Sequence, residues 1–194
     1  MNDHERALLL SLRPRFANSI LSGSKSVELR RQRLTPERGT LVILYASAPT
    51  MGIVGTARIA NAQVAAPTDV WEQFSEHLGL TYEEFETYLA GTSSASALEL
   101  TAVTPLPQPL SLEHLRVALA FSPPQSYRYL THSTLELLVT GHPAASHLFN
   151  NLPGAAVELE VGVRPHYCRT ADDRPTIPQG RPRQCRCDSD TAAG

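Results

Sequence analysis

Lysine is almost absent from this chain of 194 residues: Lys25 is the single lysine among seventeen basic residues, and the other sixteen are arginine. Such a bias, in a chain rich in alanine and proline, is typical of a GC-rich coding sequence in which lysine codons drift towards arginine. A lysine retained against that drift marks position 25 as a candidate functional residue, and retention by chance is the alternative.

Cysteine is scarce as well, and all three cysteines fall between positions 168 and 187. The rest of the chain therefore has no disulfide framework, which is typical of a reducing cytoplasm. No apolar run approaches the ~20 residues that a membrane-spanning helix needs. The apolar run near the N-terminus is too short for a secretory signal. We expect a cytoplasmic protein with no membrane attachment.

The composition is 42% hydrophobic and 19% charged, which is typical of a globular protein. A net charge of −2 excludes a uniformly basic nucleic-acid coat, but the charge is unevenly distributed. Residues 1–60 carry nine basic and four acidic side chains, whereas residues 61–163 carry two and eleven. This asymmetry indicates a local anion site in the N-terminal third, and a solvated charged face without a ligand is the alternative.

Hydrophobic periodicity predicts short strands with helices inserted between them. The expected strands are 8–12, 26–33, 41–45, 53–59 and 95–103. The expected helices are 14–21, a segment capped by Thr68 that ends at Gly79, and a segment from Thr81 whose capping box includes Glu84. A proline-rich connector over 105–109, a helix over 111–119 and a turn over 121–130 follow. This irregular spacing favours an α+β small mixed β-barrel with inserted helices over repeated βαβ units.

The C-terminal third differs in composition. A helical stretch over 135–149 and a strand over 156–163 form an expected extension, residues 132–164, packed on a first domain of residues 1–131. Arginine, proline, aspartate and glycine make up half of residues 165–194, and apolar residues are almost absent, which predicts a disordered tail. Zinc binding by His166, Cys168, Cys185 and Cys187 is disfavoured because their spacing lacks paired knuckles. We expect no metal and no cofactor.

Three segments carry the most specific patterns. They are LSLRPRFANSILSGSKSVELRR at 10–31, LVILYASAPTMGIVGTARI at 41–59 and FSPPQSYRYL at 121–130. Together they resemble the ASCH domain, a PUA-like β-barrel family related to RNA-binding modules, over about Ala7 to Leu130. The resemblance implies a cleft between barrel and helices, sized for a nucleotide or a short RNA, and protein partners remain unknown.

The chemistry of the quoted segments fits such a cleft. Lys25 at the helix-ending turn, with Arg30 and Arg31 on the next strand, offers cations to a phosphate, and Glu28 can accept from an exocyclic amine. Hydroxyl, amide and stacking groups complete the expected binding set: Ser47, Gln125 and Tyr127.

Each candidate has a structural alternative. Lys25 is otherwise a solvated turn lysine, and Glu28 with either arginine is otherwise a structural ion pair. Tyr45 on an apolar strand is otherwise a core residue, and Ser126 beside a proline is otherwise a turn former.

The resemblance implies three functions. The first is RNA or nucleotide binding through the cleft of Lys25 to Arg31. The second is cleavage of single-stranded RNA, because some family members resembling this chain are ribonucleases whose tyrosine and serine match Tyr45 and Ser126. Their lysine is replaced here by Met51, which removes a cation from the phosphate.

The third implied function is recognition of a modified nucleoside, by a regulator or by an amidohydrolase of acylated cytidine. The amidohydrolase branch uses a Lys-x-x-Thr pair and a glutamate. Lys25 matches its lysine, but Glu28 stands at the nucleophile position and Leu78 or a neighbour stands at that of the glutamate. Since this chemistry needs a hydroxyl nucleophile, we expect it to be lost in that form.

Overall fold

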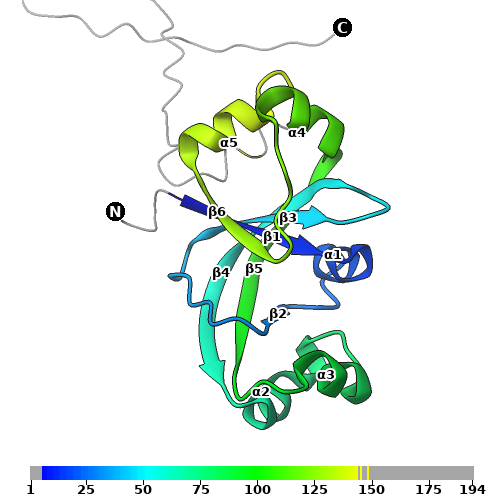
Figure 1. Cartoon of the computed structure of the whole chain (residues 1–194), viewed down its shortest axis with the longest axis vertical. Helices are drawn as coiled ribbons and strands as arrows, with labels where there is room; N and C mark the ends of the chain where they lie inside the picture. The colour runs from blue at the N-terminus through cyan, green and yellow to red at the C-terminus, as the bar shows by residue number, and fades with distance from the viewer. Residues whose placement is uncertain (1–5, 144, 146–147, 149–194) are drawn as a thin grey trace, which may run out of the picture. The chain divides into compact units, whose positions relative to one another are not determined.

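The computed structural model of the protein describes residues 6–143, 145 and 148. They form one mixed sheet with helices beyond both of its ends (Figure 1). The strands are β1 (Arg6–Leu12), β2 (Val27–Arg30), β3 (Leu41–Ala46), β4 (Gly52–Ala65), β5 (Ala95–Ser111) and β6 (Tyr127–Thr131). The helices are α1 (Pro14–Leu21), α2 (Pro67–Phe74), the 3-10 turn η2 (Ser75–His77), α3 (Tyr82–Leu89), α4 (Leu112–Leu119) and α5 (His132–Val139).

The six strands lie in the order β2-β5-β4-β3-β1-β6. Only β1 and β3 run parallel among these neighbours, and the register pairs Ser11 with Tyr45. β2 and β6 stand at the two ends of the order, and no pairing among the described strands joins them. The α+β expectation is therefore confirmed, and the expected small mixed β-barrel is represented in the described part of the chain by a six-stranded mixed sheet without closure.

The side chain of Arg30 occupies the place where a barrel would close. From the end of β2, its guanidinium donates hydrogen bonds to the carbonyl of Ser11 on β1 (3.0 Å) and to that of Ser126 before β6 (3.0 Å). A side chain thus links strands that share no backbone pairing. This bridge holds the end of β2 close to β1 and to the segment before β6 without backbone pairing.

The core consists of three clusters of buried apolar side chains. Residues of β1 alternate between the first two clusters, since Leu9 faces α4 and α5 whereas Leu8 and Leu10 face α1. The third cluster packs β2 against α2 and α3. Burial of β1 on both faces explains its nearly continuous apolar sequence.

The proline-rich segment is strand rather than connector, contrary to the expectation from its sequence. β5 continues through Pro105, Pro107 and Pro109 to Ser111. β2 pairs only with residues 96–99 of this strand, so the proline-bearing half has a neighbour on one side alone. Proline is tolerated there because the unpaired edge does not need its missing N–H.

Two helix starts illustrate what local sequence determines. The capping box of α3 is confirmed, since Thr81 Oγ1 accepts from the backbone N–H of Glu84 (3.3 Å) and the Glu84 carboxylate accepts from that of Thr81 (3.2 Å). The cap predicted at Thr68 is wrong, because α2 begins at Pro67 after Ala66. Proline at the first helical position lacks the N–H that a cap would satisfy.

Part of the 121–130 turn is strand, because β6 begins at Tyr127. Of the predicted helical stretch 135–149, α5 accounts for residues up to Val139, and it begins earlier, at His132. Leu135 and Leu138 of α5 are buried in the first core cluster. The predicted strand 156–163, the predicted tail and the three cysteines lie outside the described residues.

Candidate functional site

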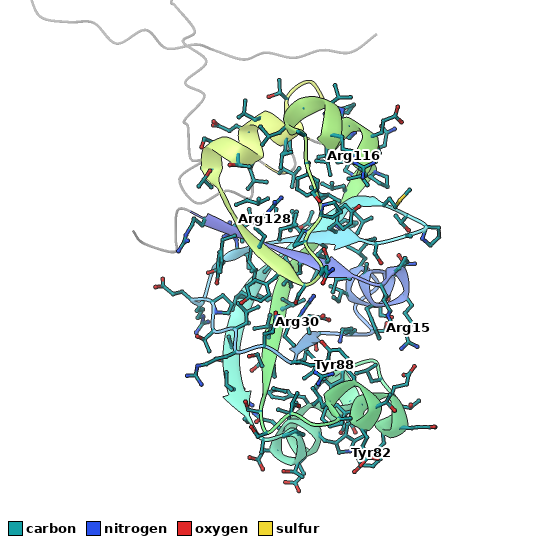
Figure 2. All side chains as sticks on the ribbon, viewed as in Figure 1. Arg15, Arg30, Tyr82, Tyr88, Arg116 and Arg128 are labelled. Carbon is teal, nitrogen blue, oxygen red and sulfur yellow. The ribbon has the colours of Figure 1, made fainter. Side chains whose placement is uncertain are left out.

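A cleft of about 740 Å³ opens between α1, β2 and α3. Figure 2 shows Arg15 of α1, Arg30 of β2 and Tyr88 of α3 around this region, and all three side chains line the cleft. The cleft also contains Ser11 and Gln125, which come from the end of β1 and from the loop before β6. Four distant segments of the chain therefore form one concave surface large enough for a nucleotide-sized ligand.

Three buried charged side chains form the floor of this cleft. The Glu28 carboxylate lies 3.3 Å from the Lys25 ammonium and 3.0 Å from the Arg30 guanidinium. The expected ion pair is thus present, but it is buried and includes Lys25 as well. Two cations against one anion leave this floor with one formal positive charge, which favours an anionic ligand above it.

Lys25 is a buried cross-link rather than a solvated turn lysine, with only 2% of its surface exposed. Its ammonium donates to the carbonyls of Val27 and Leu78, both at 2.7 Å, in addition to its contact with Glu28. These three acceptors match the three N–H bonds of an ammonium. Burial lowers the pKa of Lys25, and the neighbouring Glu28 carboxylate opposes that shift.

Arg30 is held as firmly, because its guanidinium contacts Glu28, Ser11 and Ser126. The same guanidinium lies 3.3 Å from the Ser126 hydroxyl. Its Nε atom is buried and lacks a hydrogen-bond partner among the described residues. Arg30 therefore positions the Ser126 segment against the floor of the cleft.

The rim of the cleft carries more accessible groups. Arg15 pairs with Glu84 at 2.6 Å, and Arg31 donates to the carbonyl of Ala90 at 3.0 Å. The Arg15 side chain is half exposed, and Glu84 is about a third exposed, so this ion pair is weak. Arg13 lines the cleft without such a short contact in the described region. The rim arginines are therefore more accessible to a ligand than the buried charges of the floor.

Tyr45 lies beside the cleft rather than in its lining. Its side chain is 2% exposed and belongs to the core cluster beneath α4, where its ring lies 6.3 Å from that of Phe121. Among the described residues its hydroxyl has no hydrogen-bond partner. Burial raises the pKa of Tyr45, and the charge of Arg116 partly opposes this. The tyrosine therefore stays a neutral phenol at neutral pH.

The sheet register places Tyr45, Ser11 and Ser126 side by side. Tyr45 on β3 pairs with Ser11 on β1, and the N–H of Ser11 donates to the carbonyl of Ser126 at 2.9 Å. Adjacent strands lie roughly 4.8 Å apart, so one row across three neighbouring segments joins the tyrosine to the edge of the cleft. Sequence alone does not show this row, because its members are far apart along the chain.

The predicted site residues divide into two groups. Those that line the cleft are Lys25, Glu28, Arg30, Arg31 and Gln125, and Ser126 adjoins them through Arg30. Ser47 and Tyr127 are not in the lining. The Ser47 N–H donates to the carbonyl of Leu12 at 2.8 Å, and Tyr127 packs against the second core cluster. Their predicted contact with a ligand therefore lacks support from the lining of the cleft.

Sequence reasoning missed several lining residues. Tyr88 has the spacing of a packing residue, yet it is 40% exposed and lines the cleft. Arg13, Arg15 and Phe16 stand in the quoted first segment but were not singled out. The sequence pattern that could have identified them is a pair of arginines flanking a proline at the start of a helix. In the structure, this first turn of α1 faces the cleft.

The described residues contain no group of three or more histidine, cysteine, aspartate or glutamate side chains placed to hold a metal ion. None of the helices in this part of the chain has the length and apolarity needed to cross a membrane.

Comparison with known proteins gives a consistent picture. A family model described as "Domain of unknown function (DUF365)" matches residues 7–120. An ASCH domain-containing ribonuclease from Zymomonas mobilis subsp. mobilis is 30% identical over 133 residues, which cover 68% of this chain and 89% of that protein.

Solved structures of the ASCH protein from Zymomonas mobilis are also similar. The crystal structure of that protein matches with a TM-score of 0.65 and 29% identity, over 70% of this chain and 94% of the other. A serine-to-alanine mutant of it matches with a TM-score of 0.66 and 28% identity, over 72% and 97% of the two chains. A tyrosine-to-phenylalanine mutant matches with a TM-score of 0.65 and 29% identity, over 69% and 96%.

Proposed function

Because the chain belongs to the ASCH domain family, we propose that it binds single-stranded RNA in the cleft between α1, β2 and α3 and cleaves the strand beside Tyr45. The observation that carries this proposal is the row of Tyr45, Ser11 and Ser126, which adjoins an arginine-lined cleft. A relative at 30% identity that is named as a ribonuclease supports the same activity.

Binding uses the rim more than the floor. Arg13 and Arg31 supply phosphate contacts, and Tyr88 offers a partly exposed ring on which an unstacked base can pack. Lys25, Glu28 and Arg30 set the charge and shape of the floor. Gln125 lies on an exposed loop at the cleft and offers an amide to a base edge.

Cleavage needs a proton donor and a stabilised phosphate charge. The RNA's own 2′-hydroxyl attacks the adjacent phosphorus and gives its proton to water, so the P–O2′ bond forms as the P–O5′ bond breaks. A neutral phenol suits the first task, because it donates its proton to the departing 5′-oxygen and regains one from water. Ser126 adds a hydroxyl whose position is fixed by Arg30. This assignment makes Tyr45 and Ser126 the proposed catalytic residues and leaves Lys25 as a positioning residue.

The experiment follows a fluorescent single-stranded RNA with the purified full-length chain. Wild type is expected to cut it, and Tyr45→Phe and Ser126→Ala are each expected to slow cutting about 100-fold or more, in the range seen for loss of a general acid. Arg38→Ala is a matched control, because Arg38 is exposed and lies outside the cleft lining. Absence of cutting by wild type, or full activity of both variants, contradicts the proposal.

A smaller ligand is the second candidate, because about 740 Å³ lies in the range of small-molecule sites. A modified nucleoside would then occupy the cleft without cleavage of RNA. Each oxygen of the Glu28 carboxylate contacts a cation, which lowers its nucleophilicity towards an acyl group. Thermal stabilisation by nucleosides, with no stabilisation by an RNA oligonucleotide, favours this candidate over the first.

A further inference from the structure

A second, smaller hollow lies beside helix α4 and shares no lining residue with the cleft. Its volume is about 350 Å³, and it is lined by Met51, Leu112, Glu113, Arg116 and Val117. Figure 2 places Arg116 on α4, well apart from Arg15 and Arg30 of the cleft. The hollow is therefore a separate surface, formed where the turn before β4 meets α4.

Helix α4 is fixed over Tyr45 at this point. The N–H of Leu112 donates to the carbonyl of Met51 at 2.8 Å, which ties the first residue of the helix to the turn. Leu112 and Leu115 are buried in the same core cluster as Tyr45. Arg116 stands four residues after Leu112, so both lie on one face of the helix. The fold thus presents Arg116 at the edge of the tyrosine's own packing cluster.

The Arg116 guanidinium is available to a ligand. Within the described residues it makes neither a side-chain hydrogen bond nor an ion pair, although Glu113 lines the same hollow. The cations of the cleft floor differ, because the Lys25 ammonium and the two terminal nitrogens of Arg30 already donate to acceptors inside the protein. Met51 contributes no charge and is 47% exposed. Arg116 is the cation in this lining.

We infer that Arg116 binds a phosphate of the RNA strand beside the Tyr45 hydroxyl, with the strand continuing from the cleft past Ser126 and Ser11 to this hollow. The inference rests on the proposed function and names a further catalytic residue for it. A guanidinium presents two parallel N–H donors, which match two non-bridging oxygens of a phosphodiester. It would thereby neutralise charge that grows at the reacting phosphorus.

The influence of Arg116 on Tyr45 is consistent with this geometry. Its charge lowers the pKa of Tyr45 against the larger effect of burial. A phosphate bound to Arg116 would cancel that influence and hold the phenol more firmly in its protonated form. The donor and the cation would then act on the same phosphate.

The test compares Arg116→Ala with Arg38→Ala, which removes an equal charge from an exposed position outside both hollows. With single-stranded RNA as substrate, Arg116→Ala is expected to lower kcat about 100-fold, as for loss of one electrostatic donor. Arg116→Lys is expected to retain part of the rate. Met51 lines the same hollow, so a lysine there can supply a replacement cation. The double variant Met51→Lys with Arg116→Ala is therefore expected to recover part of the kcat that Arg116→Ala loses.

Failure of this inference is distinguishable from failure of the proposed function. If wild type cleaves and Arg116→Ala cleaves within twofold of it, the inference is wrong and the ribonuclease proposal stands. If wild type does not cleave, the cleavage proposal fails, and binding of a 2′-O-methyl RNA decides the inference. The salt slope is the slope of log affinity against log salt concentration. A slope smaller in magnitude by about 0.7 in Arg116→Ala supports the phosphate contact, and an unchanged slope contradicts the inference. Thermal unfolding checks that Arg116→Ala is folded.

Discussion

Lys25 shows how far a single residue can be interpreted. Its rarity in the composition directed attention to the right place, because it lies in the floor of the cleft. Its role could not be predicted, since two of its acceptors are backbone carbonyls, one of them 53 positions away at Leu78. An ammonium whose donors are used inside the protein acts on a ligand through the groups that it holds.

Replacement of Lys25 by methionine tests this interpretation. The change keeps most of the apolar stem but removes the charge beside Glu28, so we expect it to lower the free energy of unfolding by about 3 kcal/mol, the lower end for breaking a buried pair. Arg30 still contacts Glu28, which limits the loss. Urea unfolding at pH 7 measures it, and a change below about 1 kcal/mol would refute the cross-link.

The Lys25→Met variant also separates two roles in binding. With its donors occupied, Lys25 should contribute to RNA affinity by shaping the floor, so affinity falls while the salt slope stays unchanged. A slope reduced by about 0.7 would show a direct phosphate contact instead. Titration of a labelled RNA at several salt concentrations distinguishes the two outcomes.

Tyr45 gives a pH-dependent prediction. Because burial raises its pKa in the folded state above the unfolded value of 10.0, its neutral form stabilises the fold fully below pH 10. This contribution is lost as pH rises through the folded pKa. Wild type should therefore lose stability relative to Tyr45→Phe in that alkaline range. Urea unfolding of both proteins from pH 8 to 11 tests it, and parallel curves would contradict it.

At the scale of elements, apolar patterns predicted most strands and helices but could not show which strand edges are paired. β5 was expected to stop before Pro105, yet it runs on because β2 covers only its first part. The expected barrel likewise depends on whether β2 and β6 pair with each other, which apolar patterns do not determine. Such pairings arise between segments distant in sequence, whereas the cap at Thr81 is local and was predicted correctly.

The start of α3 couples helix stability to the cleft. Thr81→Ala removes the oxygen that accepts from the backbone N–H of Glu84. We therefore expect the free energy of unfolding to fall by about 1 kcal/mol. Because Glu84 also pairs with Arg15 and Tyr88 lies on the same helix, RNA affinity should fall as well. Thr81→Ser keeps the cap and serves as the control. Equal stability of both variants in urea unfolding would show that the cap contributes little.

For the described part of the molecule, the distribution of charge matters more than its sum. The α3 side of the cleft contributes Glu83 and Glu84 to the lining, and residues 67–89 contain six acidic residues and no lysine or arginine. The acidic α3 side of the cleft therefore repels a nucleic-acid strand, whereas the arginines of the α1 side attract it. For the proposed RNA ligand, this arrangement favours a single path of the backbone along the α1 side.

The salt dependence of binding tests this path. Arg13→Ala and Arg31→Ala should each lower the slope of log affinity against log salt by about 0.7. Arg15→Ala should have a smaller effect, because Arg15 is engaged with Glu84 before RNA arrives. Arg38→Ala should leave the slope unchanged. Equal slopes for all four variants in anisotropy titrations would rule out this path.

The guanidinium of Arg30 gives the open sheet a mechanical property. Strands joined by ladders of backbone hydrogen bonds resist separation along their whole length, but β2 is joined to β1 and the segment before β6 through one residue. The resistance of β2 to separation from these two segments is therefore concentrated at a point. Loss of this one side chain would release that link, while every strand pairing in the sheet is retained.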